Sequence, residues 1–159
     1  MIARAVLLAT ALALPPVLPA QRVIRARVTP IVRTDVLVDR GVTQHVGGGA
    51  VIPAGYQLRV ALEGGAGLTR RDGEFRPSAR VDATARFLFD PFRERRIGLS
   101  AGGGAGMRWE RGERPRPVAL VLVGVQGAAL GRWVRGVDLG IGGGVRLGLT
   151  LGRPVPGRR

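Results

Sequence analysis

Apolar and polar residues alternate along most of this chain, and the repeat is two residues. In residues 75–90 the odd positions are apolar from Phe75 to Phe89, and the even positions are polar except for Leu88. Successive side chains of a β-strand point to opposite faces, so this run predicts a strand with one apolar and one polar face. A helix would scatter the same residues around its circumference. The pattern therefore limits the chain to a sheet.

The same alternation predicts six strands, at residues 42–52, 56–70, 75–90, 97–109, 118–130 and 137–151. Turn signals separate them at residues 39–41, 53–55, 71–73, 90–92, 112–117 and 131–136. Residues 23–38 also alternate, and they could supply one long strand or two short ones around Pro30, because proline is poorly tolerated within a ladder. Short connections imply antiparallel neighbours. An even strand number is expected of a single-chain bacterial barrel, so we predict an all-β, up-and-down meander closed into a small barrel of eight strands.

Alternation alone does not say which face of the sheet points inward, but three features favour apolar side chains outside. The runs are longer than the five or six residues usual in soluble sheets. The polar faces carry many glycines, which would leave room inside a narrow barrel for arginine side chains. Buried charges need partners. We therefore predict a network of charges in the lumen, formed by Arg59, Glu63, Arg80, Asp82, Arg86, Asp138 and Arg146.

The third feature is the placement of the few aromatic residues at or beside predicted strand ends. Aromatic girdles lie at such positions in membrane barrels, at the two interfaces with water. Aromatic residues of an ordinary core would tend to occur in mid-strand instead. The predicted interface aromatics are Tyr56, Phe75, Phe89, Phe92, Trp109 and Trp133, with Phe87 close by.

Two stretches of the sequence resemble small bacterial outer-membrane β-barrel proteins of the OmpA/OmpX eight-stranded type. They are SARVDATARFLFDPFRERRIGLSAGGGAG at residues 78–106 and VDLGIGGGVRLGL at residues 137–149, where the second is similar to a closing strand. The resemblance covers roughly residues 42–152 and includes no catalytic signature. It implies a location in the outer membrane, with the membrane's lipids and the outer-membrane assembly machinery as partners. Such barrels usually end on an aromatic residue, whereas the last predicted strand here ends near Leu151.

The ends of the chain predict export. Residues 1–20 combine Arg4, an apolar stretch at residues 5–14, three prolines and a small residue at Ala20, as in a cleaved secretory signal. The alternative is an uncleaved membrane anchor, but the apolar run is shorter than the about 20 residues that a spanning helix needs. We expect residues 21–152 to form the barrel domain and residues 153–159 to form a disordered basic tail.

The composition excludes several classes of chemistry. The chain has no cysteine, a single histidine and a formal net charge of +14. All the basic residues are arginine, so a Walker-type lysine and a Schiff base are absent. Ser100 lies in a G-x-S-x-G match, but the match falls inside an alternating strand instead of the strand-to-helix turn that a nucleophile requires. We expect His45 to be a strand-face or rim residue, and we expect no catalytic residue, metal or cofactor.

The positive charge has two interpretations that fit a barrel. Arginines in the turns could meet anionic lipid phosphates, or they could simply keep the turns solvated. A nucleic-acid partner is not expected, because the arginines are dispersed along strands and turns and no helix is predicted to enter a groove. The leading hypothesis is a monomeric, non-enzymatic outer-membrane barrel with a structural or envelope role. The alternative is a secreted or periplasmic soluble β-barrel that binds an apolar ligand in its interior.

Overall fold

The structure is a computed structural model, and it describes residues 28–90 and 97–153. The predicted signal segment, the N-terminal residues up to 27, Phe92 and the tail from residue 154 onward lie outside the described residues. No helix among the described residues is long and apolar enough to cross a membrane.

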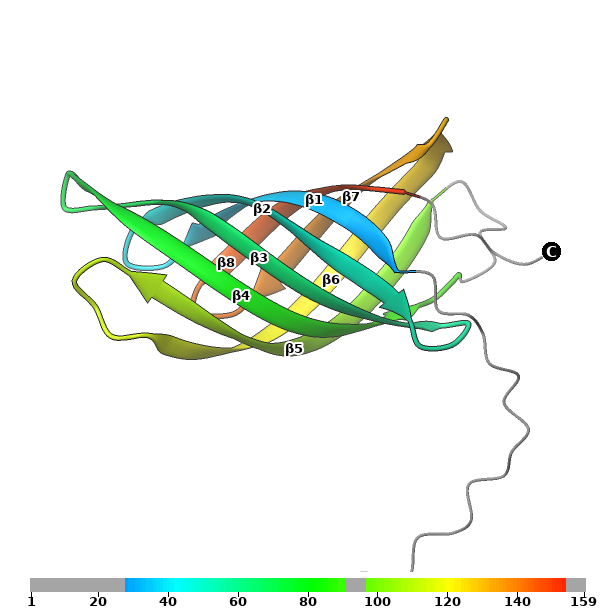
Figure 1. Cartoon of the computed structure of the whole chain (residues 1–159), viewed down its shortest axis with the longest axis horizontal. Helices are drawn as coiled ribbons and strands as arrows, with labels where there is room; N and C mark the ends of the chain where they lie inside the picture. Colours follow the sequence, from blue (N-terminus) through cyan, green and yellow to red (C-terminus); the bar gives the residue numbers. More distant parts are fainter. Residues whose placement is uncertain (1–27, 91–96, 154–159) are drawn as a thin grey trace, which may run out of the picture.

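Eight antiparallel strands form a closed barrel in which each strand pairs with its neighbours in the sequence and β1 pairs with β8 (Figure 1). The predicted fold class and strand number are therefore confirmed. Connections β1–β2, β3–β4, β5–β6 and β7–β8 lie at one end, called the turn end. The opposite end, called the terminus end, contains the connections β2–β3 and β6–β7, together with the first residue of β1 and the last residue of β8. The strands are β1 Thr29–Val38, β2 Val42–Pro53, β3 Leu58–Arg71, β4 Glu74–Leu88, β5 Gly98–Glu110, β6 Arg116–Leu130, β7 Trp133–Ile141 and β8 Val145–Gly152.

The division of the chain into these strands differs from the prediction at two places. The run at residues 137–151 is not one strand: Gly142 to Gly144 form a turn inside it, and β7 already begins at Trp133. Gly143 and Gly144 have φ values of 67° and 142°, which only glycine adopts readily. The turn has three residues, so Ile141 and Val145 keep the same parity and the alternation runs through it unbroken.

The N-terminal segment was expected to supply one long strand or two short ones, and its described residues form a single strand, β1. Pro30 is the second residue of β1, and it lies outside the part of β1 that pairs with β8, which runs from Ile31 to Val38. At that position the missing N–H of proline interrupts no bond of that ladder. The predicted turn at residues 71–73 is confirmed as a two-residue hairpin, in which Asp72 and Gly73 both have positive φ, as a hairpin of this length favours.

The apolar faces of the strands point outward. Val81 in the centre of β4 is 45% exposed and Leu147 in β8 is 50% exposed, whereas the alternate positions Arg80 and Arg146 are almost completely buried. The direction predicted for the two faces is thus the one found. Leu88, the one apolar residue on the polar face of its run, keeps its parity and is buried inside the barrel. Leu120 and Leu122 also point inward, which explains why β6 is apolar on both faces.

Closure between the first and last strands can be tested by cross-linking, since the chain contains no cysteine. Val36 and Leu147 are direct partners on the outer face of β1 and β8. Directly opposed residues have Cβ atoms close enough for a disulfide. We expect the double variant Val36→Cys, Leu147→Cys to cross-link on mild oxidation and to migrate differently from its reduced form on a denaturing gel.

A control pair, Val36→Cys with Leu151→Cys, displaces one partner by four residues, or about 13 Å along β8. It should remain reduced under the same conditions. Equal cross-linking of the two pairs, or none in either, would contradict the β1–β8 register.

Candidate functional site

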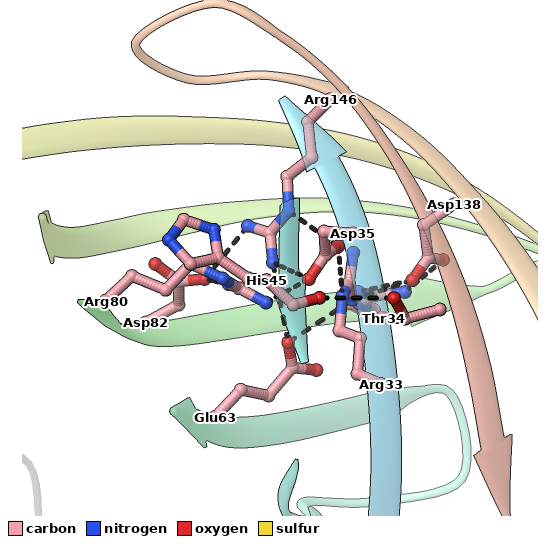
Figure 2. Close-up of polar contacts among 10 residues, drawn as sticks. Arg33, Thr34, Asp35, His45, Glu63, Arg80, Asp82, Asp138 and Arg146 are labelled. Carbon is pink, nitrogen blue, oxygen red and sulfur yellow. Dashed lines mark hydrogen bonds and ion pairs between the residues drawn. The ribbon is translucent and has the colours of Figure 1, made fainter. Parts of the chain in front are cut away.

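The middle of the barrel interior holds a cluster of ion pairs, called the lumen cluster. It consists of four arginines and four carboxylates from five strands: Arg33, Asp35, Glu63, Arg80, Asp82, Arg86, Asp138 and Arg146. Figure 2 labels all of them except Arg86. Each side chain is at an inward position of its strand, so the two-residue period alone directs all eight toward the axis. Equal numbers of both signs leave this cluster without net charge.

Asp35 is the carboxylate that most arginines of the cluster share. The Nε atom of Arg33 donates to its Oδ1 atom at 2.7 Å, and the Nε atom of Arg146 donates to the same oxygen at 2.9 Å. Arg80 binds its other oxygen, Oδ2, and also binds Asp82. Because Asp35 is 1% exposed, removing its charge would leave three buried guanidinium groups around a neutral side chain.

Asp138 joins a second part of the cluster. It accepts hydrogen bonds from Arg33 at 2.8 Å and from Arg86 through two guanidinium nitrogens, at 2.5 and 3.0 Å. The two bonds from Arg86 form a bidentate pair, the strongest common geometry for arginine and a carboxylate. Glu63 lies 3.2 Å from Arg33 and 3.9 Å from Arg146 and so connects both parts. The ion pairs thus connect five strands of the wall, β1, β3, β4, β7 and β8, across the bore.

Glycines make room for these charged side chains, as the sequence predicted. A Cβ atom added to Gly148 would lie 2.5 Å from Arg33 Nη2 and 2.5 Å from Asp35 Oδ1. One added to Gly106 would collide with the carboxylate of Asp82, and one added to Gly124 with that of Asp138. The bore is thus narrow enough that an alanine methyl group competes with the ion pairs for space.

Apolar side chains lie above and below the lumen cluster. Ala61, Leu88 and Val134 are buried toward the terminus end, and Leu37 and Leu120 toward the turn end. A cavity of about 60 Å³ lies toward the terminus end and one of about 30 Å³ toward the turn end. Each has room for no more than a few water molecules. The described interior is therefore filled by its own side chains.

A second set of ion pairs, called the rim cluster, closes the turn end. Arg71 lies 2.6 Å from Glu113, Arg116 lies 2.6 Å from the same carboxylate, and Arg108 lies 3.0 Å from Asp39. Glu110 is 3.7 Å from Arg108. The hydrogen bond from Arg71 lowers the pKa of Glu113 below its ordinary value. Arg71, Arg108 and Arg116 are thus each bound to a carboxylate.

Six of the seven predicted network residues belong to the lumen cluster. Arg59, the seventh, is half-buried on the lumen face and lines the larger cavity. The prediction omitted Arg33 and Asp35, which are central to the cluster. Their signal was present, because both lie on the polar face of the alternating run before residue 39. What the sequence did not indicate is that β1 contributes the carboxylate shared by three arginines.

The structure places Ser100, the serine of the G-x-S-x-G match, apart from His45, the only histidine of the chain: Ser100 lines the cavity toward the terminus end and His45 the one toward the turn end. Ser100 is buried near the start of a regular strand, β5, with its hydroxyl 3.5 Å from the carbonyl oxygen of Gly124. Of the two positions expected for His45, strand face or rim, the structure shows the strand face: His45 is buried on the lumen side of β2, and its Nε2 atom lies 3.0 Å from the hydroxyl of Ser78. No group of three or more potential metal ligands occurs among the described residues.

The described aromatic residues lie at the two ends of the outer surface. Phe75 and Trp109 are near the turn end, where the guanidinium of Arg70 lies 5.8 Å from the ring centre of Phe75. The others, near the terminus end, are Tyr56, Phe87, Phe89 and Trp133, and the rings of Phe87 and Phe89 meet edge to face. Aliphatic and small side chains fill the outer surface between these two groups.

Comparison with known proteins supports the fold. The solution NMR structure of the de novo designed TMB2.3 is similar, with a TM-score of 0.50 and 15% sequence identity over 83% of this chain and 96% of that chain. No family model matches the sequence, and no curated protein matches it either. The similarity shows a shared eight-stranded barrel architecture, and the chain is assigned to no family by it.

Neutralising Asp35 tests the lumen cluster. We expect Asp35→Asn to lower the free energy of unfolding by about 3–5 kcal/mol, because it leaves buried guanidinium groups without their shared counter-charge. Glu74→Gln removes a carboxylate of an exposed pair, 3.0 Å from Arg76, and should cost less than about 1 kcal/mol. Urea unfolding of the refolded protein in detergent micelles would measure both. Similar losses in the two variants would contradict the role given to Asp35.

A methyl group tests how tightly the bore is packed. Gly148→Ala should lower the free energy of unfolding by about 1–3 kcal/mol, since the new Cβ atom must displace Arg33 and Asp35. Gly64→Ala is the matched control, because its nearest neighbour would be a carbonyl oxygen 3.7 Å away. A stable Gly148→Ala variant in the same unfolding assay would show that the interior is looser than these distances imply.

Proposed function

We propose that this protein is an outer-membrane β-barrel with a structural role in the cell envelope and no catalytic activity. The observation that carries the proposal is the inversion of the barrel: aliphatic side chains cover the outside, and eight charged side chains fill the middle of the bore. Only an apolar surrounding makes that distribution favourable, because water would otherwise contact the large apolar surface.

Several features support a membrane as the surrounding. Strands of 12–15 residues in β2 to β6 exceed the about 9–11 tilted residues that cross a hydrocarbon layer. The two aromatic groups lie at the ends of the apolar surface, where interfacial girdles are found. In a closed barrel every strand has two neighbours, so no ladder edge faces lipid. The predicted signal segment and the resemblance to bacterial outer-membrane barrels favour the outer membrane.

The proposed role follows from what the interior offers. The described bore contains ion pairs and leucine side chains around cavities of about 60 and 30 Å³, which leave no wide path for a solute. His45 and Ser100 lie apart, and both are buried. We therefore propose that the protein is a monomer without a cofactor. Its proposed partners are the lipids of the outer membrane and the outer-membrane assembly machinery. The soluble ligand binder is not favoured, because its interior would have to be apolar and spacious.

Fractionation combined with one charge substitution tests the proposal. We expect the protein to remain in salt-washed outer membranes and to change its gel mobility on heating. Val81→Arg places a charge at the centre of the outer face and should destabilise the inserted barrel by about 2–4 kcal/mol. The control Gln44→Arg lies on the outer face near the turn end and should cost about 0–1 kcal/mol.

The soluble alternative predicts the reverse of each result. It predicts recovery in the soluble fraction, and an arginine at position 81 would be tolerated because it would face water. Either outcome would reject the membrane assignment.

A further inference from the structure

The hairpin between β6 and β7 extends beyond the rest of the barrel wall at the terminus end. β6 pairs with β5 only as far as Gln126, which is opposite Gly98, although β6 continues to Leu130. β7 starts at Trp133, while its ladder with β8 starts at Val134. Figure 1 shows this hairpin projecting past its neighbours. Its tip, residues 127–135, is called the hairpin tip below.

The hairpin tip combines exposed apolar and cationic side chains. Leu130 is 66% exposed and Trp133 is 46% exposed, and Arg132 and Arg135 are both exposed beside them. The tip contains no acidic residue, and neither arginine makes an ion pair with any part of the chain that the structure describes. A tryptophan between two free guanidinium groups matches the boundary between hydrocarbon and phosphate.

The turn end differs in its charge. There Arg71, Arg108 and Arg116 are bound to carboxylates of the rim cluster, and Arg76 is bound to Glu74. The other exposed arginines of this end make no ion pair within the described chain, but they lie among carboxylates; they are Arg40, Arg70, Arg111 and Arg114. The turn end also displays Asp72, which adds a further negative charge. Arg132 and Arg135 are therefore available to bind an external anion, whereas the arginines of the rim cluster are already bound to carboxylates.

We propose that the hairpin tip binds the phosphate groups of anionic phospholipids in the leaflet at the terminus end. This inference rests on the proposed membrane location. The planar guanidinium groups of Arg132 and Arg135 each present paired N–H donors that fit phosphate oxygens, and the two exposed residues are three positions apart on one hairpin. Trp133 and Leu130 would enter the adjoining acyl region and hold the arginines at headgroup depth. The result is a barrel with one lipid-selective end.

The two tryptophans of the chain make this proposal measurable, since they lie at opposite ends of the barrel. Trp109→Phe leaves Trp133 as the reporter of the terminus end, and Trp133→Phe leaves Trp109 as the reporter of the turn end. Each variant would be refolded into phosphatidylcholine vesicles that contain the same small fraction of brominated phosphatidylglycerol or brominated phosphatidylcholine. Bromine quenches only a nearby tryptophan. The ratio of quenching by brominated phosphatidylglycerol to quenching by brominated phosphatidylcholine therefore reports how far the anionic lipid is enriched around that tryptophan.

We expect the ratio at Trp133 to exceed that at Trp109 by at least about twofold, because two cations near the surface enrich anionic lipid locally. Replacing Arg132 and Arg135 with glutamine in the Trp109→Phe background should return the ratio at Trp133 to about one. Arg70→Gln and Arg111→Gln in the Trp133→Phe background form the matched control and should change the ratio at Trp109 much less. High salt should reduce the Trp133 ratio, as screening requires.

Equal ratios at the two tryptophans would overturn the proposal, since they would attribute enrichment to the overall charge of the protein. A Trp133 ratio unchanged by the glutamine substitutions would do the same. Failure of the membrane assignment would look different, because neither tryptophan would then be quenched by either brominated lipid.

Discussion

Ion pairs across the bore are the interaction on which the rest of this structure depends. A closed sheet whose apolar face points outward must fill its interior with the other face of each strand, and in this chain that face is charged. Isolated charges in such an interior would be expensive. The lumen cluster avoids that cost because its four arginines and four carboxylates contact one another directly, with Asp35 and Asp138 each held by more than one guanidinium group. Glycines supply the space for this contact.

The same arrangement limits what the barrel can do. Side chains that neutralise one another across the bore also occupy it, and the leucines on either side of them close the remaining volume. A small barrel of this kind can contact other molecules only through its outer surface and its two ends. Any selectivity in what it binds must therefore depend on those surfaces. The two ends differ: carboxylates lie among the arginines of the turn end, whereas Arg132 and Arg135 lie on the hairpin tip, which contains no acidic residue.

Much of the fold could be predicted because the two-residue period carries both the strand assignment and the direction of each side chain. Once the apolar face was placed outside, the positions of Glu63, Arg80, Asp82 and Arg146 in the lumen followed from parity alone. The two-residue period gave a wrong strand boundary where a turn left the alternation of apolar and polar positions unchanged. The three-residue turn after Ile141 left the alternation intact, so β7 and β8 were read as one strand, and the eighth strand was sought near Pro30 instead.

The sequence by itself determined the architecture: strands, short connections, an apolar exterior and a charged interior, because each depends on local spacing along the chain. Only the tertiary structure decided which charges meet. Asp35 and Arg146 are 111 residues apart in the sequence, and their contact exists because β1 and β8 are neighbours at the closure of the barrel. It also decided that His45 contacts Ser78 and that one hairpin extends past its neighbours. These features depend on strand register and relative strand length, which alternation does not encode.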